Sequence, residues 1–419
     1  MTTSAQLSNI LLRRNLRALA MAAMLLVVPI LILMPTAQAQ TFTVLHTFTG
    51  GPDGENPYAP VTLDSTGSLY GQTVSSYDDS QAGTIYKVTP RSYGWTFAPL
   101  SHGGGWGGVT IGPNGSLYGT GHVAYDTIGV FNVQPPPHFL PNPLSPWIQT
   151  SLYALEVGSE YYTAGVVFDR AGNIYGTTSG DEAGTVYELS PSDGGWTETV
   201  LHYFGEGLDG FLPLDSLVLD AAGNIYGTTE MGGDYGLGTV FELSYSPESG
   251  WTESFVYSFT GGEDAEYPFG GLIFDSSGNL YGATAGTYSP GGIVGTVFRL
   301  TPSGGSWTFS TIYSFGATGQ GDQCGPRGTP AMDGAGNLYD TTACLGAYSL
   351  GSVFKLTPAN GTWSYTTLHD FTGRSDGGYP QAGVTLDANG NIYGTAAIGG
   401  SPGGDCGSNG CGVVWEITP

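Results

Sequence analysis

Residues 221–230 read AAGNIYGTTE, and close variants recur as RAGNIYGTTS at 170–179, SSGNLYGATA at 276–285 and ANGNIYGTAA at 388–397. The Leu-Tyr or Ile-Tyr pair at the centre of this stretch marks seven copies in all. Their tyrosines are Tyr70, Tyr118, Tyr175, Tyr226, Tyr281, Tyr339 and Tyr393. The mean spacing of about 54 residues is close to the roughly 50 residues of a β-propeller blade. The sequence is therefore an array of seven similar units.

The composition points to strands. The chain has 419 residues, of which 70 are glycine and 26 are proline, and only 11% are charged. Glycine and proline at this density divide a sequence with frequent turns. The abundance of Thr, Tyr, Val and Phe favours strands, because β-branched and aromatic side chains fit a pleated, half-buried surface. We therefore predict an all-β fold.

Each repeat contains four short apolar segments separated by turn signals. In the fourth repeat the expected strands are 215–220, 224–229, 238–243 and 251–259. Apolar and polar residues alternate within these segments, as they do in half-buried antiparallel strands. The Ala-Ala-Gly-Asn turn between the first two segments supplies residues that tolerate positive φ. Each repeat thus predicts one four-stranded antiparallel blade.

The two ends of the chain predict how the array closes. Residues 412–419 match a third strand, whereas residues 41–48 match a fourth strand. A closed ring explains this arrangement, since the N-terminal strand then completes the last blade and leaves only short protected edges. We predict a seven-bladed β-propeller, formed by residues 40–419 as a single domain and closed by the N-terminal strand pairing in the last blade.

Residues 1–39 differ from the repeats and predict a signal peptide. Three arginines between residues 13 and 17 precede an apolar run from Ala18 to Met34, and residues 37–39 read Ala-Gln-Ala. Small residues at this spacing are typical of a signal peptidase site. The expected mature protein begins at Gln40 and is secreted or periplasmic. A retained transmembrane anchor is the alternative, because the run is just long enough to span a bilayer.

The charge balance excludes several classes of partner. Ten Lys and Arg residues stand against 35 Asp and Glu residues, which gives a net charge of −25. Such a surface has no basic patch that could displace counterions from a phosphate backbone, and it repels anionic polysaccharides and anionic membranes. We therefore expect no nucleic acid partner, and no membrane association once the signal peptide has been removed.

Four cysteines lie late in the chain, and export makes disulfides the default. In up-and-down blades, the connection that enters a blade and the loop between its second and third strands lie on one face. Cys324 and Cys344 occupy these two connections of one blade, whereas Cys406 and Cys411 share a single loop. We therefore predict the pairs Cys324–Cys344 and Cys406–Cys411. A zinc site is the alternative for the four thiolates.

The repeats have the form L-H-x-F-x-G, then P-x-x-G-x-x-x-D-x-x-G-N-[LI]-Y-G-T-T, then G-T-V-[FY]-x-L-[ST]-P. They resemble the repeats of exported bacterial proteins known as choice-of-anchor tandem repeat GloVer-containing proteins, over almost all of residues 41–419. The D-x-x-G-N-[LI]-Y element is also similar to the first hairpin of NHL and SMP-30-type propellers. The second repeat departs from the pattern, because Gly112 replaces the aspartate and prolines are inserted at 135–137. We expect its blade to be irregular.

One set of aspartates precedes the turn between the first two segments of each repeat. These residues are Asp64, Asp169, Asp220, Asp275, Asp333 and Asp387. A set of metal ligands or catalytic carboxylates is one interpretation. We favour a structural role, because aspartate at a tight turn accepts hydrogen bonds from nearby backbone N–H groups.

A second set of side chains lies in the long connections that follow each fourth strand. Its aspartates come five residues after the last aromatic residue of the strand, Glu160 holds the equivalent place after Leu155, and its tyrosines adjoin prolines. Binding residues tend to lie on variable loops above a rigid scaffold, so this set is the candidate ligand site. Its members are Asp53, Tyr58, Glu160, Asp209, Asp264, Tyr267, Asp376 and Tyr379. The alternative is again structural, since Asp-Gly forms turns readily.

The sequence contains no nucleophile elbow, P-loop or H-E-x-x-H motif. We therefore favour a non-enzymatic exported protein that binds a neutral glycan or a protein partner, without a cofactor. A lactonase-like or glycan-active hydrolase or lyase, with its site at the mouth of the channel, is one alternative, because a fold does not determine function. An assembly or adhesion module is another. Ca²⁺ binding in the acidic loops stays open, although the EF-hand spacing is absent.

Overall fold

In the computed structural model, the described residues are 40–74, 83–124, 127–136, 147–155, 164–179, 183–205, 208–286, 293–316, 324–400 and 406–419. The predicted signal peptide and the candidate residue Glu160 lie outside these ranges. Residues Phe42–Thr418 form one compact unit. No helix in the described ranges has the length and hydropathy needed to cross a bilayer.

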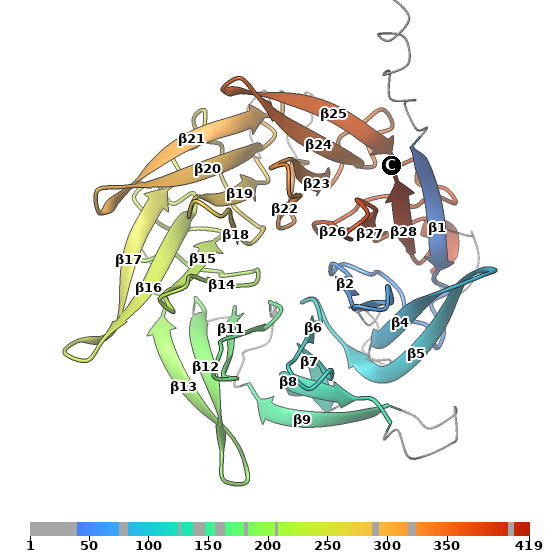
Figure 1. Ribbon diagram of the computed structural model, residues 1–419, viewed down its shortest axis with the longest axis horizontal. Coiled ribbons are helices and arrows are strands. Elements are labelled where there is room, and N and C mark those ends of the chain that lie inside the picture. Colours follow the sequence, from blue (N-terminus) through green and yellow to red (C-terminus); the bar gives the residue numbers. More distant parts are fainter. Residues whose placement is uncertain are drawn as a thin grey trace, which may run out of the picture. The chain divides into compact units, whose positions relative to one another are not determined.

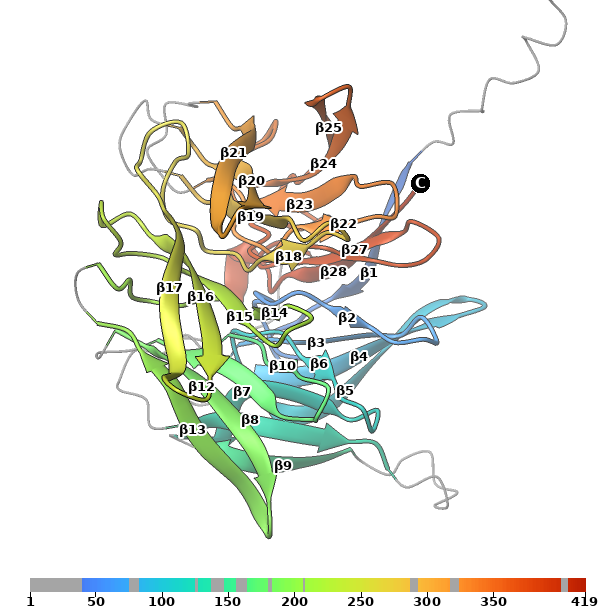
Figure 2. The same ribbon diagram turned by 60° about the vertical axis from the view of Figure 1, so that its left-hand side comes forward.

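Within these ranges the strands form seven four-stranded sheets in a ring, with the first strand of each sheet at the axis and the fourth at the periphery (Figure 1). Blades 1 to 3 consist of β2 (Thr62–Leu63), β3 (Leu69–Gln72), β4 (Gly83–Arg91) and β5 (Gly94–Gly104); β6 (Thr110–Ile111), β7 (Leu117–Ala124), β8 (Thr127–Gln134) and β9 (Ile148–Ala154); and β10 (Val167–Phe168), β11 (Ile174–Thr178), β12 (Thr185–Ser192) and β13 (Gly195–Tyr203). Successive sheets twist as they follow one another around the ring (Figure 2).

Blades 4 to 6 repeat the same order of four strands. They consist of β14 (Val218–Leu219), β15 (Ile225–Thr229), β16 (Thr239–Ser246) and β17 (Gly250–Ser258); β18 (Ile273–Phe274), β19 (Leu280–Thr284), β20 (Thr296–Ser303) and β21 (Ser306–Ser314); and β22 (Ala331–Met332), β23 (Leu338–Thr342), β24 (Ser352–Ala359) and β25 (Thr362–Asp370). Neighbouring strands within each blade are antiparallel. The predicted seven-bladed β-propeller is confirmed.

Blade 7 joins the two ends of the chain. It contains β26 (Thr385–Leu386), β27 (Ile392–Ala396) and β28 (Val413–Thr418), and β1 (Thr41–Thr47) pairs with β28 as the fourth strand. The N–H of Phe48 donates to the carbonyl oxygen of Gly412 at 3.0 Å. Phe48 is buried and packs against Val61 and Tyr86 of blade 1. The predicted closure is confirmed, and the C-terminus lies beside β1 in Figure 1.

The innermost strands are shorter than predicted. In blade 4, β14 covers only two residues, where we expected a strand over 215–220. The residues before Val218 belong to the entering connection, and the Asp215 carboxylate there bonds to the neighbouring blades instead of joining a strand. The other three strands of this blade begin and end within three residues of the prediction.

The glycine of the repeated stretch makes room for an aromatic ring. Gly227 lies opposite Phe241 of the third strand, and Phe241 is fully buried. A Cβ at Gly227 would lie 2.5 Å from Phe241 Cζ, which is far inside van der Waals contact. Most other blades repeat this pairing, as Gly71 with Tyr86, Gly119 with Phe131, Gly176 with Tyr187, Gly282 with Phe298 and Gly394 with Trp415. In blade 6 the position is Asp340.

The threonines of the stretch hold blades and strands together. The Thr228 hydroxyl donates to the carbonyl oxygen of Gly270 in the next blade at 3.0 Å, and the Thr229 hydroxyl lies 2.7 Å from that of Thr239. Equivalent bonds to the next blade are donated by Thr120, Thr177, Thr341 and Thr395. Each such bond satisfies a backbone carbonyl that would otherwise be buried without a partner.

The turn aspartates serve their own turns, as expected. Asp220 accepts the N–H groups of Ala222 and Asn224 at 2.8 and 2.9 Å, and the Asn224 amide at 2.8 Å. In blade 2, where Gly112 replaces the aspartate, Asn114 accepts the N–H of Ser116 at 3.0 Å and donates to the Tyr118 hydroxyl at 3.2 Å. Blade 2 keeps four strands. The expected irregularity is seen in the pairing of β7 with β8, whose register shifts between His122 and Ala124, while residues 137–146 of the insert lie outside the described ranges.

The hydrophobic core lies between blades. Trp307 of blade 5 packs edge-on against Tyr226 of blade 4, with ring centroids 5.9 Å apart. Nearer the other end of the same interface, Tyr257 of blade 4 stacks on Phe309 of blade 5 at 4.1 Å. Each blade is thus stabilised mainly by its two neighbours, and the ring is stable only when every interface is filled.

Both predicted disulfides are present. Cys324–Cys344 joins the connection entering blade 6 to the loop after β23, with Cα atoms 4.6 Å apart. Cys406–Cys411 spans the short helix η1 (Gly407–Asn409), with Cα atoms 5.3 Å apart. Because both pairs are disulfides and no cysteine is free, the alternative of a zinc site built from four thiolates is wrong. The two bonds are compatible with an oxidising compartment.

We predict that Gly227→Ala destabilises the protein by roughly 1–3 kcal/mol, because its Cβ would overpack the buried Phe241 ring. Gly195→Ala is the matched control, since nothing lies within 4 Å of a Cβ there and the glycine does not have positive φ. The control should change the free energy of unfolding by less than about 0.5 kcal/mol. Urea denaturation measures both values, and equal effects of the two substitutions would contradict this explanation of the repeat.

Candidate functional site

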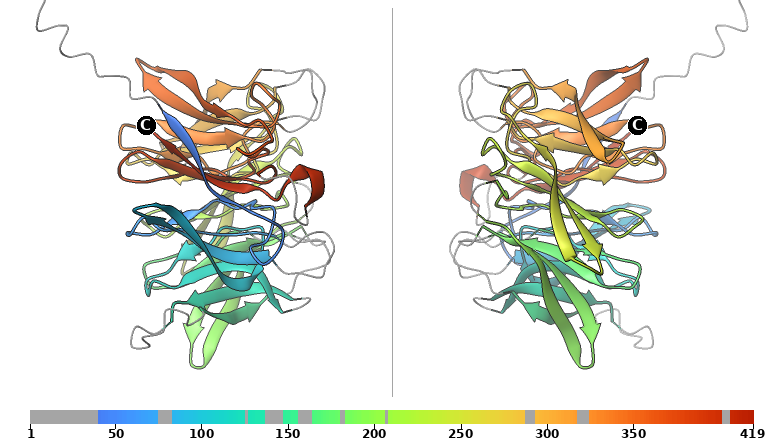
Figure 3. Two further views of the ribbon diagram at one scale, coloured as in Figure 1. Left: turned by 90° about the vertical axis from the view of Figure 1, so that its right-hand side faces the viewer. Right: turned by 90° about the vertical axis from the view of Figure 1, so that its left-hand side faces the viewer.

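The long connections gather on one face of the ring. The connection entering a blade pairs with the loop between the second and third strands of the same blade, as Phe211 does with Met231 and Gly378 with Ile398. The loop that carries η1 belongs to this set and projects from one side of the ring in Figure 3. We call this side the long-loop face. It is the face on which the candidate ligand residues were predicted to lie.

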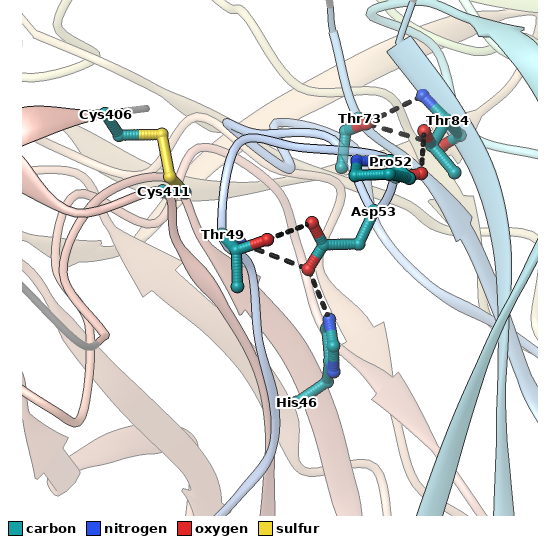
Figure 4. Close-up of polar contacts among 8 residues, drawn as sticks. All are labelled: His46, Thr49, Pro52, Asp53, Thr73, Thr84, Cys406 and Cys411. Atoms are coloured by element: carbon teal, nitrogen blue, oxygen red, sulfur yellow. Dashed lines mark hydrogen bonds and ion pairs between the residues drawn. A yellow bond between two sulfur atoms is a disulfide. The ribbon is translucent and has the colours of Figure 1, made fainter. Parts of the chain in front are cut away.

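Asp53 binds the loop that contains it (Figure 4). Its carboxylate accepts the hydroxyl and the N–H of Thr49 at 2.5 and 3.1 Å, and His46 Nε2 lies 3.2 Å from Oδ2. The carbonyl oxygen of Pro52 accepts the Thr84 hydroxyl at 3.1 Å, which fastens the loop to β4. The carboxylate therefore holds the long connection in one conformation.

Asp264 and Asp376 repeat this arrangement. Asp264 is only 4% exposed and accepts the Tyr257 hydroxyl at 2.9 Å and the Thr260 N–H at 2.7 Å. Asp376 accepts the Thr372 N–H at 2.9 Å and lies 3.2 Å from His369 Nε2. Burial alone would raise the pKa of Asp376, but the hydrogen bonds from Thr372 and His369 outweigh it and hold that pKa below its usual value. These carboxylates shape the face, and their contact with a ligand stays a prediction.

Asp209 differs from the other three. Its Oδ2 accepts the N–H of Gly205 at 2.7 Å, which fixes the loop, while its Oδ1 lies 3.3 Å from His202 Nε2. The Asp209 side chain is 31% exposed. A third group, Glu253 of blade 4, approaches the same histidine nitrogen to 3.8 Å.

The predicted tyrosines occupy two different positions. Tyr267 and Tyr379 precede a proline and have positive φ, whereas Tyr58 follows Pro57 and lies four residues before β2. Tyr58 is therefore equivalent to residues that the sequence analysis missed. Four residues before the innermost strand of their blades lie Trp106, Leu214, Phe269, Arg327 and Gln381. Together with Tyr58 we call them the channel rim; the seventh position, residue 163, is outside the described ranges.

Neighbouring rim residues touch one another. Tyr58 and Trp106 stack with ring centroids 4.6 Å apart and planes inclined by 20°. The Arg327 guanidinium lies 5.0 Å from the centroid of the Phe269 ring, and its Nη1 donates to Gln381 Oε1 at 3.0 Å. Trp106 is 41% exposed. The rim therefore presents aromatic faces beside a guanidinium and an amide on the long-loop face.

Below the rim the innermost strands approach closely. A Cβ at Gly328 would collide with the backbone of Ala382 and Gly383 in the next blade. Asp215 accepts the Gly271 N–H at 2.7 Å and the Thr329 hydroxyl at 3.0 Å, which ties blade 4 to blades 5 and 6. Burial, together with the nearby Asp215, raises the pKa of Asp340 well above its usual value. These groups stabilise the interior, whereas the rim residues are partly buried except for the exposed Trp106.

A pocket of about 220 Å³ lies elsewhere on the long-loop face, between blades 5 and 6. It adjoins the Cys324–Cys344 disulfide, and Tyr313, Phe315 and Tyr365 contribute to its wall. Tyr313 and Tyr365 stack on each other with ring centroids 4.8 Å apart. Their rings therefore fill the interface between the two blades as well as lining the pocket.

The fold is that of a seven-bladed β-propeller. Its four-stranded blades are closed into a ring by the N-terminal strand, and its long loops lie on one face. The chain belongs to the Gloeobacter/Verrucomicrobia repeat family, whose profile matches residues 33–241, 147–323 and 243–419. A search of curated proteins found no match.

Several solved structures are similar in fold. An aldose sugar dehydrogenase from Streptomyces coelicolor is 12% identical, with a TM-score of 0.46 over 92% of this chain and 100% of that chain. A putative 6-phosphogluconolactonase from Bacteroides uniformis is 14% identical, with a TM-score of 0.49 over 78% and 96%. A gluconolactonase from Xanthomonas campestris is 14% identical, with a TM-score of 0.41 over 92% and 98%. At such identities the similarity concerns the fold alone.

We predict that Asp264→Ala lowers the free energy of unfolding by roughly 1–3 kcal/mol, because it removes the acceptor of the part-buried hydrogen bonds from the Tyr257 hydroxyl and the Thr260 N–H. Glu263→Ala is the matched control, because Glu263 is exposed. This substitution should change the free energy of unfolding by less than about 0.5 kcal/mol. Chemical denaturation measures both. A neutral effect of Asp264→Ala would show that the carboxylate does not hold its loop.

Proposed function

We propose that the protein is a non-enzymatic, exported binding propeller that holds a neutral glycan on the channel rim. The observation that carries this proposal is the stacked pair of Tyr58 and Trp106, in the connections that enter blades 1 and 2, with the Trp106 side chain 41% exposed. Large aromatic rings left exposed on a stable scaffold are a common mark of an interaction site.

The chemistry of the rim suits an uncharged sugar. The negative face of an aromatic ring attracts C–H groups that carry partial positive charge, and a pyranose presents such groups on its flat faces. Arg327 and Gln381, which are joined at 3.0 Å, add donors and an acceptor for hydroxyl groups. The net charge of −25 disfavours sugars that carry carboxylate or sulfate.

Binding explains the rim better than catalysis does. The six described rim residues include no carboxylate, histidine, serine or cysteine, so they offer neither a nucleophile nor a general base of ordinary reactivity. Export, which the signal peptide predicted from the sequence implies and with which the two disulfides are compatible, would bring the face into contact with extracellular polysaccharides. A protein partner on the same face and an assembly role are the competing outcomes of the experiment below.

A glycan array probed with the purified protein identifies the ligand, and calorimetry then compares variants on the strongest neutral glycan. We predict that Trp106→Ala weakens binding at least about tenfold, which corresponds to a loss of about 1.4 kcal/mol. Tyr93→Ala is the control, because Tyr93 is an 81% exposed aromatic residue in the β4–β5 turn on the other face. Tyr93→Ala should leave the affinity unchanged.

The same assay separates the rim from the loop tyrosines. If the double variant Tyr267→Ala, Tyr379→Ala loses binding while Trp106→Ala does not, the ligand contacts the outer loops and the rim is not the site. Failure of the protein to bind any neutral glycan on the array would contradict the proposal as a whole.

A further inference from the structure

The outer part of most interfaces between blades contains the same stacked pair. A histidine or tyrosine near the end of one fourth strand stacks on an aromatic residue near the start of the next. The pairs are His46 with Phe97, Tyr257 with Phe309, Tyr313 with Tyr365 and His369 with Phe42, with centroids 3.8 to 4.8 Å apart. The histidines of this set also bond to a loop aspartate, as His46 does to Asp53 and His369 to Asp376.

Three blades carry no aromatic residue at the second of these positions, where Gln149, Glu198 and Glu253 stand. The interface between blades 3 and 4 is distinguished by a histidine, His202, that faces the glutamate Glu253. The two side chains come from neighbouring blades, and the Asp209 carboxylate completes the group from the loop after β13. All three are largely buried, with side-chain exposures of 19%, 11% and 31% for His202, Glu253 and Asp209.

The three groups converge, but two of their buried atoms have no hydrogen-bond partner among the described residues. His202 Nε2 lies 3.3 Å from Asp209 Oδ1 and 3.8 Å from Glu253 Oε2, and one ligand atom from each residue lies within 4.8 Å of the others. Nevertheless, His202 Nε2 and Glu253 Oε1 are buried atoms with no hydrogen-bond partner in the described part of the chain. Buried polar atoms without partners are costly and call for an explanation.

A metal ion accounts for this spacing. Imidazole nitrogen and carboxylate oxygens bind Zn²⁺ at about 2.0–2.2 Å, so tetrahedral ligand atoms lie roughly 3.4 Å apart. The observed separations need only a small inward shift of the side chains to match. The Gly205 N–H bond to Asp209 Oδ2, at 2.7 Å, leaves Oδ1 directed at the site, as outer hydrogen bonds commonly do for metal ligands.

We propose that His202, Asp209 and Glu253 form a binding site for a divalent transition-metal ion, with Zn²⁺ as the best fit to one imidazole and two carboxylates. Two carboxylates and a neutral histidine carry a charge of −2, which a divalent cation neutralises. Three protein ligands leave at least one coordination position for water or an exogenous ligand, and the partial exposure of Asp209 opens the site to solvent.

A proton is the competing occupant of the site. Burial, the hydrogen bond with Asp209 and the charge of that carboxylate together raise the pKa of Glu253 to about 9. A protonated Glu253 would relieve the repulsion between the carboxylates and would leave His202 Nε2 with Asp209 Oδ1, 3.3 Å away, as its nearest acceptor. The two hypotheses therefore differ in whether the protein binds Zn²⁺ when the metal is added.

The test is a calorimetric titration of tag-free, EDTA-treated protein with ZnCl₂. We expect one saturable site per chain with a dissociation constant in the micromolar range or below. Glu253→Phe introduces the aromatic residue that four other interfaces have, so this variant should fold and yet bind Zn²⁺ at least about 100-fold more weakly. Glu198→Phe makes the same change at the equivalent position of blade 3 and should bind like the wild type.

A second measurement identifies the ligands. X-ray absorption of the zinc-loaded protein should show only nitrogen and oxygen neighbours with one imidazole, and His202→Gln should remove the imidazole signal. Absence of a saturable site in the wild type would overturn the proposal, and so would undiminished affinity in both Glu253→Phe and His202→Gln. Neither result depends on whether the channel rim binds a glycan.

Discussion

Closure of the ring by β1 is the constraint on which the rest of the structure depends. A propeller blade buries most of its apolar surface against its neighbours, so an open array would leave two unfilled interfaces. Pairing of β1 with β28 removes both, and the Thr395 hydroxyl then donates to the carbonyl oxygen of Ala59 at 3.0 Å across the junction of the chain ends. Tyr393 of blade 7 likewise packs with Trp95 of blade 1. The junction is thus built like every other interface.

The repeated residues were predictable because the same geometry favours them in most blades. Gly227 is small beneath the ring of Phe241, and an aspartate such as Asp220 accepts the N–H groups of its turn. A preference that recurs in six of the seven blades leaves a periodic signal in the sequence. For this reason the blade number, the strand order, the closure and the disulfide pairs all followed from the sequence alone.

The candidate site was only partly predictable, because functional positions differ from blade to blade. The rim position holds Tyr58, Trp106 and Arg327 in different blades, so no repeated letter marks it. The rim position lies four residues before the innermost strand of each blade. It could not be counted from the sequence, because the apolar pattern predicts longer innermost strands than the structure has. The loop aspartates were located correctly, although their hydrogen bonds to neighbouring backbone could not be seen in advance. The contact between His202 and Glu253 could not be predicted from the sequence, because the two residues lie in different blades.

The repeats therefore act as internal controls for one another. Where seven equivalent positions carry one residue type, the fold explains it, and where one position departs, the departure needs a local reason. Asp340 in place of glycine is a departure of this kind, and so is the contact of His202 with Glu253, where four other interfaces have two stacked rings. The contact of His202 with Glu253 carries the metal-site proposal, whereas the exposed Trp106 carries the glycan proposal from a position that varies from blade to blade.

Thermal unfolding of a chain that lacks residues 40–48 tests the closed ring most directly. The account predicts that the midpoint falls by at least about 10 °C, because the removal exposes the interfaces on both sides of blade 7. It also predicts that a synthetic peptide of residues 40–48 restores part of the loss by binding the folded ring. An unchanged midpoint, with no effect of the peptide, would contradict closure by β1.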